Sequence, residues 1–250
     1  MAARKIEYRT KLLILYCIWW LIWAYKPWHF SDWVLENILP VVFVPLLIYT
    51  RNRFRFSSVS YTTIFIFLCL HTIGAHYTYA DVPYEEWTGA LGFSLNDIFG
   101  FERNHFDRLV HFCFGLLLGY PMLELFARVA DTRGAWSYYF PLELVMSLSM
   151  IYELVEWAAA VYFGGELGMA YLGTQGDPWD AHKDMGLATI GAIICVSVVA
   201  YFSWRYNKDF RKEFAASLRV KHEEPLGEVR LRELKQTKRE HEVDDETGRE

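Results

Sequence analysis

Acidic and histidine side chains interrupt apolar segments of the chain at spacings of one helical turn. The spacing is three or four residues in each pair: Asp107 with His111, Glu153 with Glu156, and Asp180 with Asp184. Residues three or four apart on an α-helix share one face, so each pair can point into the same cavity. Carboxylates and imidazoles in one cavity can act as general acid and base, or bind Zn²⁺, Mn²⁺ or Mg²⁺. The candidate catalytic residues are therefore Asp107, His111, Glu153, Glu156 and Asp184.

Neighbouring charged residues and two further histidines extend this candidate site. The substrate-binding candidates are charged residues next to the catalytic set: Arg108, Lys183 and Asp180. The two cations among them suit an anionic headgroup. The metal-ligand candidates are His71 and His76, together with His111 and Asp184. The cofactor is left open, and a divalent metal ion is what these residue types suit.

Purely structural interpretations also exist for these residues. Residues 177–180 form an expected helix start, with an aspartate cap, a proline and an acid in the first turn. Asp107, Arg108 and His111 can form an ion-pair network between helices, and His71 can be a hydrogen-bonded core histidine. Ionisable groups inside a membrane span cost about 2.5–3.5 kcal/mol each on insertion scales. So many of them together need either chemistry or a packing network as their reason.

The composition sets the class of protein that must position these groups. Hydrophobic residues make up 53% and aromatic residues 18% of the 250 residues, which exceeds the usual content of a soluble domain. Apolar runs that can cross about 30 Å of hydrocarbon lie at about 12–25, 33–50, 57–79, 105–127, 138–163 and 184–204. We predict an all-α, polytopic integral membrane protein with a six-transmembrane-helix bundle over residues 1–204.

The placement of lysine and arginine predicts the orientation of this bundle. These residues concentrate before the first span, after the second, after the fourth and in the tail, so both termini are predicted to be cytoplasmic. The loops at 26–33, 80–104 and 164–183 then face outward, and the candidate site lies in the outer half. The tail, 205–250, is predicted to be partly helical and then disordered. Its twelve basic and twelve acidic residues leave no net charge, so nucleic acid is not an expected partner.

Four sequence segments carry a resemblance to a known family: "HTIGAHYTYADVPY", "RNHFDRLVHFCFG", "YELVEW" and "YLGTQGDPWDAHKDM". In this order they resemble the signature segments of the YjdF-like family of bacterial inner-membrane proteins, over about residues 57–204. The resemblance implies a multi-pass protein of the bacterial cytoplasmic membrane. It implies no activity, because that family is known chiefly as uncharacterised.

A more distant resemblance is to VanZ-like membrane proteins. The matching positions are Asp107, His111, Glu153, Asp184 and Gly191. The chain departs from that pattern because Glu156 stands where Gln is common, Ala188 stands where Asn is usual, and an arginine before the aspartates is absent. VanZ-like proteins are associated with glycopeptide-antibiotic resistance at the cell envelope. The resemblance therefore implies a lipid substrate of the envelope.

These observations leave three functions open. The first is a hydrolase or transferase that acts on a membrane lipid or a lipid-linked envelope substrate. The second is a cation-binding or proton-coupled transport protein that uses the same polar groups. The third is an accessory membrane protein without catalysis, in which the polar groups only fix helix packing.

Overall fold

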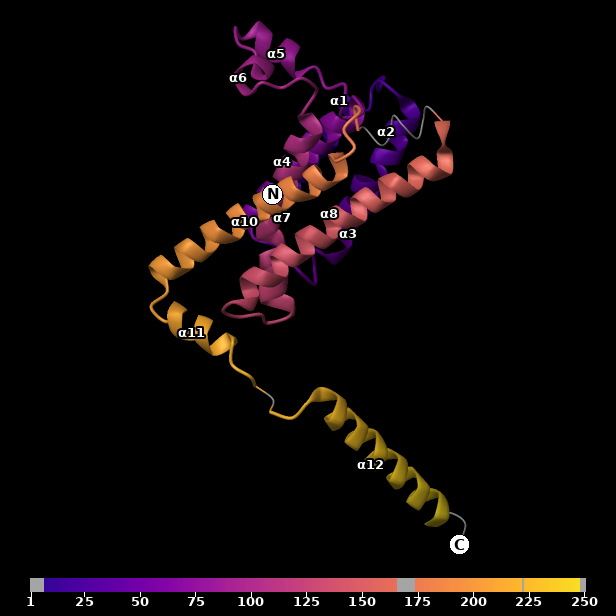
Figure 1. Cartoon of the computed structure of the whole chain (residues 1–250), viewed down its shortest axis with the longest axis vertical. Coiled ribbons are helices and arrows are strands. Elements are labelled where there is room, and N and C mark those ends of the chain that lie inside the picture. Colours follow the sequence, from indigo (N-terminus) through magenta and orange to yellow (C-terminus); the bar gives the residue numbers. More distant parts are fainter. Residues whose placement is uncertain (1–6, 166–173, 222, 248–250) are drawn as a thin grey trace, which may run out of the picture.

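The structure is a computed structural model that describes residues 7–165, 174–221 and 223–247. Every regular element in these residues is a helix, which confirms the predicted all-α class (Figure 1). The helices are α1 (Tyr8–Trp23), α2 (Phe30–Glu36), α3 (Ile38–Thr50), α4 (Ser58–His76), α5 (Tyr84–Ala90), α6 (Leu95–Phe99), α7 (Phe106–Val129), α8 (Trp136–Phe163), α10 (Asp180–Tyr206), α11 (Phe210–Ser217) and α12 (Leu226–Thr247). Residues 166–173, part of the predicted 164–183 loop, lie outside the described residues.

Within the described residues, five segments are long and apolar enough to cross a bilayer. They are Phe30–Thr50, Ser58–His76, Phe106–Val129, Trp136–Phe163 and Asp180–Tyr206. The first of them contains both α2 and α3. The predicted span at 12–25 overlaps α1, whose 16 residues fall short of the roughly 20 that a bilayer requires. The count of six spans and the cytoplasmic termini remain predictions.

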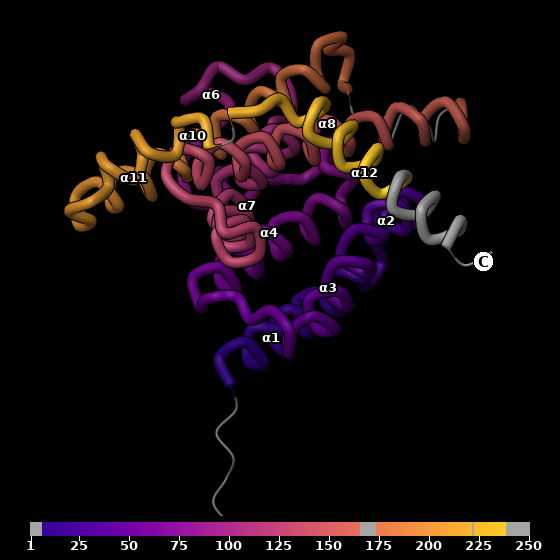
Figure 2. Tube along the Cα trace, turned by 90° about the horizontal axis from the view of Figure 1, so that it is seen from below, coloured from indigo at the N-terminus to yellow at the C-terminus, as the bar shows by residue number. Residues whose placement is uncertain are grey.

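The long helices form two groups that meet at α4 (Figure 2). On one side α4 packs against α1, and on the other it packs against α7. The helices α7, α8 and α10 pack against one another, and the contact between α7 and α10 is the most extensive in the bundle. The candidate residues on α7, α8 and α10 therefore belong to three helices in mutual contact.

Small residues allow α7 and α10 to approach closely. A Cβ atom placed on Gly115 would lie 1.8 Å from the carbonyl oxygen of Ala188, and one on Gly191 would lie 2.2 Å from that of Phe112. Both distances are shorter than any real van der Waals contact, so neither position accepts a side chain in this arrangement. Close packing through small residues is a common way to associate helices in membranes. It sets the separation between the polar residues of α7 and those of α10.

A polar contact fixes the C-terminal end of α7. The carboxylate of Glu124 accepts hydrogen bonds from Ser57 N (2.9 and 3.0 Å), Ser60 Oγ (2.6 Å) and Arg128 Nη1 (2.7 Å). Ser57 also caps α4, since its Oγ accepts from Ser60 N. Glu124 therefore joins the end of α7 to the start of α4 and has a structural role.

The described part of the tail contains helix. The helix α12 extends away from the bundle (Figure 1), and the disorder of the last residues stays a prediction. Glu, Arg, Lys and Leu dominate this segment and have high helix propensity. An ion pair one turn apart, Arg230 with Glu233 at 3.0 Å, adds to it.

Candidate functional site

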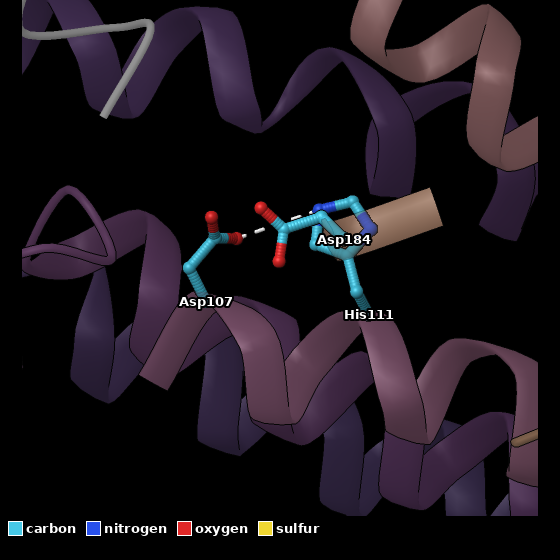
Figure 3. Close-up of side chains that lie close together, drawn as sticks. All are labelled: Asp107, His111 and Asp184. Carbon is cyan, nitrogen blue, oxygen red and sulfur yellow. Dashed lines mark ion pairs between the residues drawn. The ribbon is translucent and has the colours of Figure 1, made fainter. Parts of the chain in front are cut away.

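His111 on α7 is the centre of the polar cluster, with carboxylates from three helices around it. Its Nε2 lies 3.5 Å from Asp107 Oδ1 and 3.5 Å from Glu153 Oε1 of α8. Ligand atoms of Asp107, His111 and Asp184 of α10 all lie within 4.8 Å of one another. Figure 3 shows the two aspartate carboxylates pointing toward each other beside the imidazole ring. The structure thus brings four of the five candidate catalytic residues into one group.

The fifth candidate, Glu156, lies one turn further along α8. Its carboxyl group interacts with that of Glu153 and is within electrostatic range of Asp107 and Asp184. Glu156 therefore adds a fourth carboxyl group to the edge of the cluster.

Buried oxygens of this cluster are not satisfied by the protein. Asp184 is only 2% exposed and His111 8%. Among the described residues, Asp184 Oδ1 and Glu153 Oε1 have no hydrogen-bond partner. A buried polar atom without a partner costs about 1–3 kcal/mol, more when it is charged. A proton, a water molecule or a bound ion at these atoms would remove this cost.

The charges of the cluster are also unbalanced. Asp107, Glu153 and Asp184 surround a single imidazole. Two ionised carboxylates about 5 Å apart repel by about 3 kcal/mol at an effective dielectric constant of about 20. Shared protons or a bound cation must offset this repulsion.

The geometry of the group fits a divalent metal. Zn²⁺ holds imidazole nitrogen and carboxylate oxygen at about 2.0–2.2 Å, so two of its ligand atoms are at most about 4.4 Å apart. The 4.8 Å limit for Asp107, His111 and Asp184 is within small side-chain rotations of that value. The unpartnered Oδ1 of Asp184 supplies an acceptor that such an ion would satisfy.

An ion-pair network covers the end of the bundle where α7 and α10 begin. Arg108 Nη2 lies 2.6 Å from Asp177 Oδ2 and 3.2 Å from Asp180 Oδ1. Lys183 Nζ lies 2.6 Å from the same oxygen of Asp177, and Arg103 Nη2 pairs with Asp180. All three candidate binding residues, Arg108, Lys183 and Asp180, therefore lie in one network next to the cluster.

Arg103 is the member of this network that the sequence did not single out. It precedes α7, and we assigned it only to a loop. Its Nη1 donates to Thr174 O at 2.5 Å, so it ties that loop to the segment before α10. The available signal was its position four residues before Asp107 in "RNHFDRLVHF".

Two groups at this end have shifted pKa values because of the network. The hydrogen bond from Lys183, the backbone N–H of Trp179 and the Arg108 guanidinium hold the pKa of Asp177 well below its usual range. Burial, with the positive charge of Arg108, lowers the pKa of His105. Asp177 is thus a carboxylate held in its charged form. It is not the helix N-cap, because α10 begins at Asp180 with Trp179 as its N-cap.

The structure does not bring His71 and His76 into the cluster. His71 is buried, with Nε2 3.1 Å from Glu36 O and Nδ1 bonded to the Tyr79 hydroxyl. His76 Nδ1 lies 2.7 Å from Trp23 O. Both nitrogens of His71 are occupied by protein atoms, as in the structural interpretation of a core histidine. Among the described residues, the group that could hold a metal ion consists of Asp107, His111 and Asp184.

Glu36 is a second site residue that the sequence did not reveal. It lies on α2, is 5% exposed, and its Oε2 accepts a 2.8 Å hydrogen bond from Tyr152 Oη. The Tyr152 ring in turn makes an edge contact with the His111 ring, with centroids 5.9 Å apart. Glu36 therefore extends the polar path from the cluster to α2. The available signal was its position four residues after Asp32, the same one-turn spacing as in the other acidic pairs.

Comparisons with known proteins relate this chain to membrane proteins. A family model described as "Predicted membrane protein (DUF2238)" matches residues 8–205. The Inner membrane protein YjdF of Escherichia coli (strain K12) is 35% identical over 179 residues, which cover 71% of this chain and 82% of that protein. No solved structure matches significantly. These matches confirm the YjdF-like resemblance, and the VanZ-like resemblance stays a prediction. Because the family model includes all the helices that carry the cluster, the chain belongs to the DUF2238 family of predicted membrane proteins and is a multi-pass inner-membrane protein.

Proposed function

We propose that this protein is a membrane enzyme that hydrolyses or transfers the headgroup of a lipid or lipid-linked envelope substrate. The observation that carries the proposal is the Asp184 carboxylate. It is 2% exposed and has an unpartnered oxygen among the described residues, and it lies within 4.8 Å of Asp107 and His111. A buried acid in that position is expensive unless it binds something.

The residues of the cluster divide into two roles in this proposal. Asp107, His111 and Asp184 hold a divalent metal ion, which when bound polarises the oxygen of a phosphoryl or carbonyl group. Glu153 lies 3.5 Å from His111 on a different helix and acts as the general base that takes a proton from the attacking water or alcohol. Glu156, three residues after Glu153 on α8, interacts with it and orients its carboxyl group.

The arginines beside the cluster suit the negative charge of a headgroup. Arg103 and Arg108 each have a buried Nε without a hydrogen-bond partner among the described residues. Their other nitrogens pair with Asp177 and Asp180. A phosphate that displaces Asp177 or Asp180 from these guanidinium groups can accept the hydrogen bonds that favour arginine in phosphate recognition. In the orientation that the positive residues predict, this end faces outward.

Metal analysis of the purified protein tests the proposal. We expect about one divalent ion per chain in the wild type. The metal affinity of Asp184→Asn should be at least about tenfold lower, because the change removes a direct ligand of the ion. Asp184→Asn keeps the shape of the side chain. Glu86→Gln, which removes an exposed acid of α5, is the matched control and should keep the ion.

Activity is then measured on a bacterial lipid extract and on defined lipid phosphates. The wild type should release phosphate or headgroup, and Asp184→Asn and Glu153→Gln should not, with thermal stability near that of the wild type. A wild type without metal, or an Asp184→Asn protein that retains it, would argue against the proposed site. If both variants lose only stability, the cluster is a packing device and the accessory role is correct.

A second function, cation binding or proton-coupled transport, has support from one feature. The hydrogen bond between Tyr152 and Glu36 continues the polar path from His111 away from the ion-pair network. A path of this kind suits the passage of protons or a cation between helices. Ion uptake into proteoliposomes tests this function. Transport would be favoured over hydrolysis if Glu36→Gln lost the uptake and kept its metal content and lipid turnover.

A further inference from the structure

A groove lies between α1, α3 and α4 at the opposite end of the bundle from the cluster. Its space is about 630 Å³, part of it open to the surroundings. Its walls include Leu13 of α1, Leu47 of α3 and Leu68 of α4. The residues that line it include no member of the cluster, so the groove is separate from the site already described.

The groove lies where α3 stands apart from α1 and α4. The helices α2 and α3 are divided at Asn37, whose Oδ1 accepts a 2.6 Å hydrogen bond from Trp20 Nε1. The helix α4 packs extensively against α1, whereas α3 approaches α1 and α4 much less closely. Side chains of α3, including Val44 and Leu47, line the groove together with side chains of α1 and α4.

Polarity changes along the groove in one direction. Leu13 and Leu68 belong to its apolar walls, and Arg9 and Arg51 stand at one end of it, because Arg9 is one turn before Leu13 on α1 and Arg51 follows the last residue of α3. Arg9 Nη1 donates to Arg51 O at 3.2 Å, so the two arginines come together where α1 begins and α3 ends. Within residues 7–165 and 174–221, the Arg51 guanidinium has no ion-pair partner, whereas Arg9 pairs with Glu7 at 2.6 Å.

We propose that this groove binds one anionic phospholipid. Its acyl chain lies between the apolar walls, and its phosphate meets the free guanidinium of Arg51 beside Arg9. The charge and the polarity gradient both match this ligand, since a lipid has an anionic head and an apolar tail along one axis. A soluble anion would use only the arginine end and would leave the apolar part unfilled.

Lipid retention by the purified protein tests the proposal. Protein in detergent is mixed with phosphatidylglycerol or phosphatidylethanolamine of the same acyl chains, and bound lipid is counted by native mass spectrometry. We expect phosphatidylglycerol to be retained about fivefold more than phosphatidylethanolamine, the effect of about one arginine at a membrane surface. Arg51→Gln should remove this preference. The side chain of Arg51 has no ion pair to lose among the described residues, so the fold should be unchanged.

Two further variants separate the lipid site from general charge effects. Leu47→Trp fills the groove and should lower the retention of both lipids, with melting behaviour as the check on its fold. Arg133→Gln is the matched control. Arg133 is an exposed arginine that follows α7, lies outside the groove and pairs with Asp131. This variant should retain both lipids as the wild type does. The proposal would be overturned if the wild type retained the two lipids equally or if Arg51→Gln kept the preference for phosphatidylglycerol. It would also be overturned if Leu47→Trp retained as much lipid as the wild type, or if glycerol phosphate alone displaced the lipid.

Discussion

Gly115 of α7 lies directly against Ala188 of α10, so that a Cβ atom on Gly115 would fall 1.8 Å from the Ala188 carbonyl oxygen. One turn before Gly115 on α7 is His111, and one turn before Ala188 on α10 is Asp184. The closest point of the helix crossing is thus one turn away from the cluster on both helices. The distance between His111 and Asp184 therefore depends on the absence of a side chain at Gly115.

Gly115→Ala should separate α7 from α10. The added methyl group meets backbone, which cannot rotate away, so we expect a loss of about 1–3 kcal/mol or more in unfolding free energy. Metal content should fall as well, because Asp184 moves away from His111. Gly186→Ala is the control on α10, since nothing lies within 4 Å of a Cβ there. Thermal melts and metal analysis that give the same result for both variants would contradict this interpretation.

Tyr152→Phe should destabilise the protein through Glu36. The change removes the hydroxyl that donates to Glu36 Oε2 at 2.8 Å and leaves a buried carboxyl oxygen without that donor. We expect a loss of about 1–3 kcal/mol in unfolding free energy. Tyr162→Phe, on the same helix but 84% exposed, should cost nearly nothing. Equal melting temperatures for the two variants would show that the Tyr152 hydroxyl is dispensable.

The ion pairs of Asp177 should make stability depend on acid pH. Its folded pKa lies below the unfolded value of about 3.9. The pairs with Lys183 and Arg108 therefore stabilise the folded protein above about pH 4, and this stabilisation is lost as pH falls through the lower folded pKa. Asp177→Asn should melt below the wild type at pH 7, and the gap should narrow at pH 3. Asp131→Asn, which breaks a 77% exposed pair, is the control and should melt close to the wild type. A difference in melting temperature between Asp177→Asn and the wild type that grew in acid would contradict the prediction.

The predicted orientation can be measured directly. Reporter fusions after Arg55, after Arg133 and at the C-terminus should report the cytoplasm, and a fusion at Glu86 should report the periplasm, because lysine and arginine concentrate at the first set of positions. A cytoplasmic signal at Glu86 would turn the cluster inward. The proposed envelope substrate would then have to be a lipid of the inner leaflet.

The sequence predicted the all-α class and the meeting of α7, α8 and α10 because both depend on local patterns. Apolar length identifies a span, and a spacing such as that of Asp107 and His111 places residues on one helix face. Acids within apolar runs must face a protein interior. For this reason Asp107, His111, Glu153 and Asp184 could be grouped before any coordinates were known.

Other parts of the site depend on long-range contacts that no local pattern encodes. Glu36 reaches the cluster region only because α2 packs near Tyr152, 116 residues later in the chain. His71 had the right residue type, but Glu36 and Tyr79 occupy its nitrogens. Arg103 looked like a loop charge because its partner, Asp180, lies 77 residues away.

The sequence distance between α7 and α10 has a consequence for biosynthesis. Arg108 emerges from the ribosome 72 residues before Asp180, a delay of about 4–14 seconds at usual synthesis rates. During that interval α7 carries Asp107, Arg108 and His111 without the residues of α10 that neutralise them, at a cost that hydrocarbon imposes on each charge. The insertion machinery must therefore shelter α7 until α10 arrives. A nascent chain that stops before Asp180 would present α7 to the quality-control proteases of the membrane as an unfinished span.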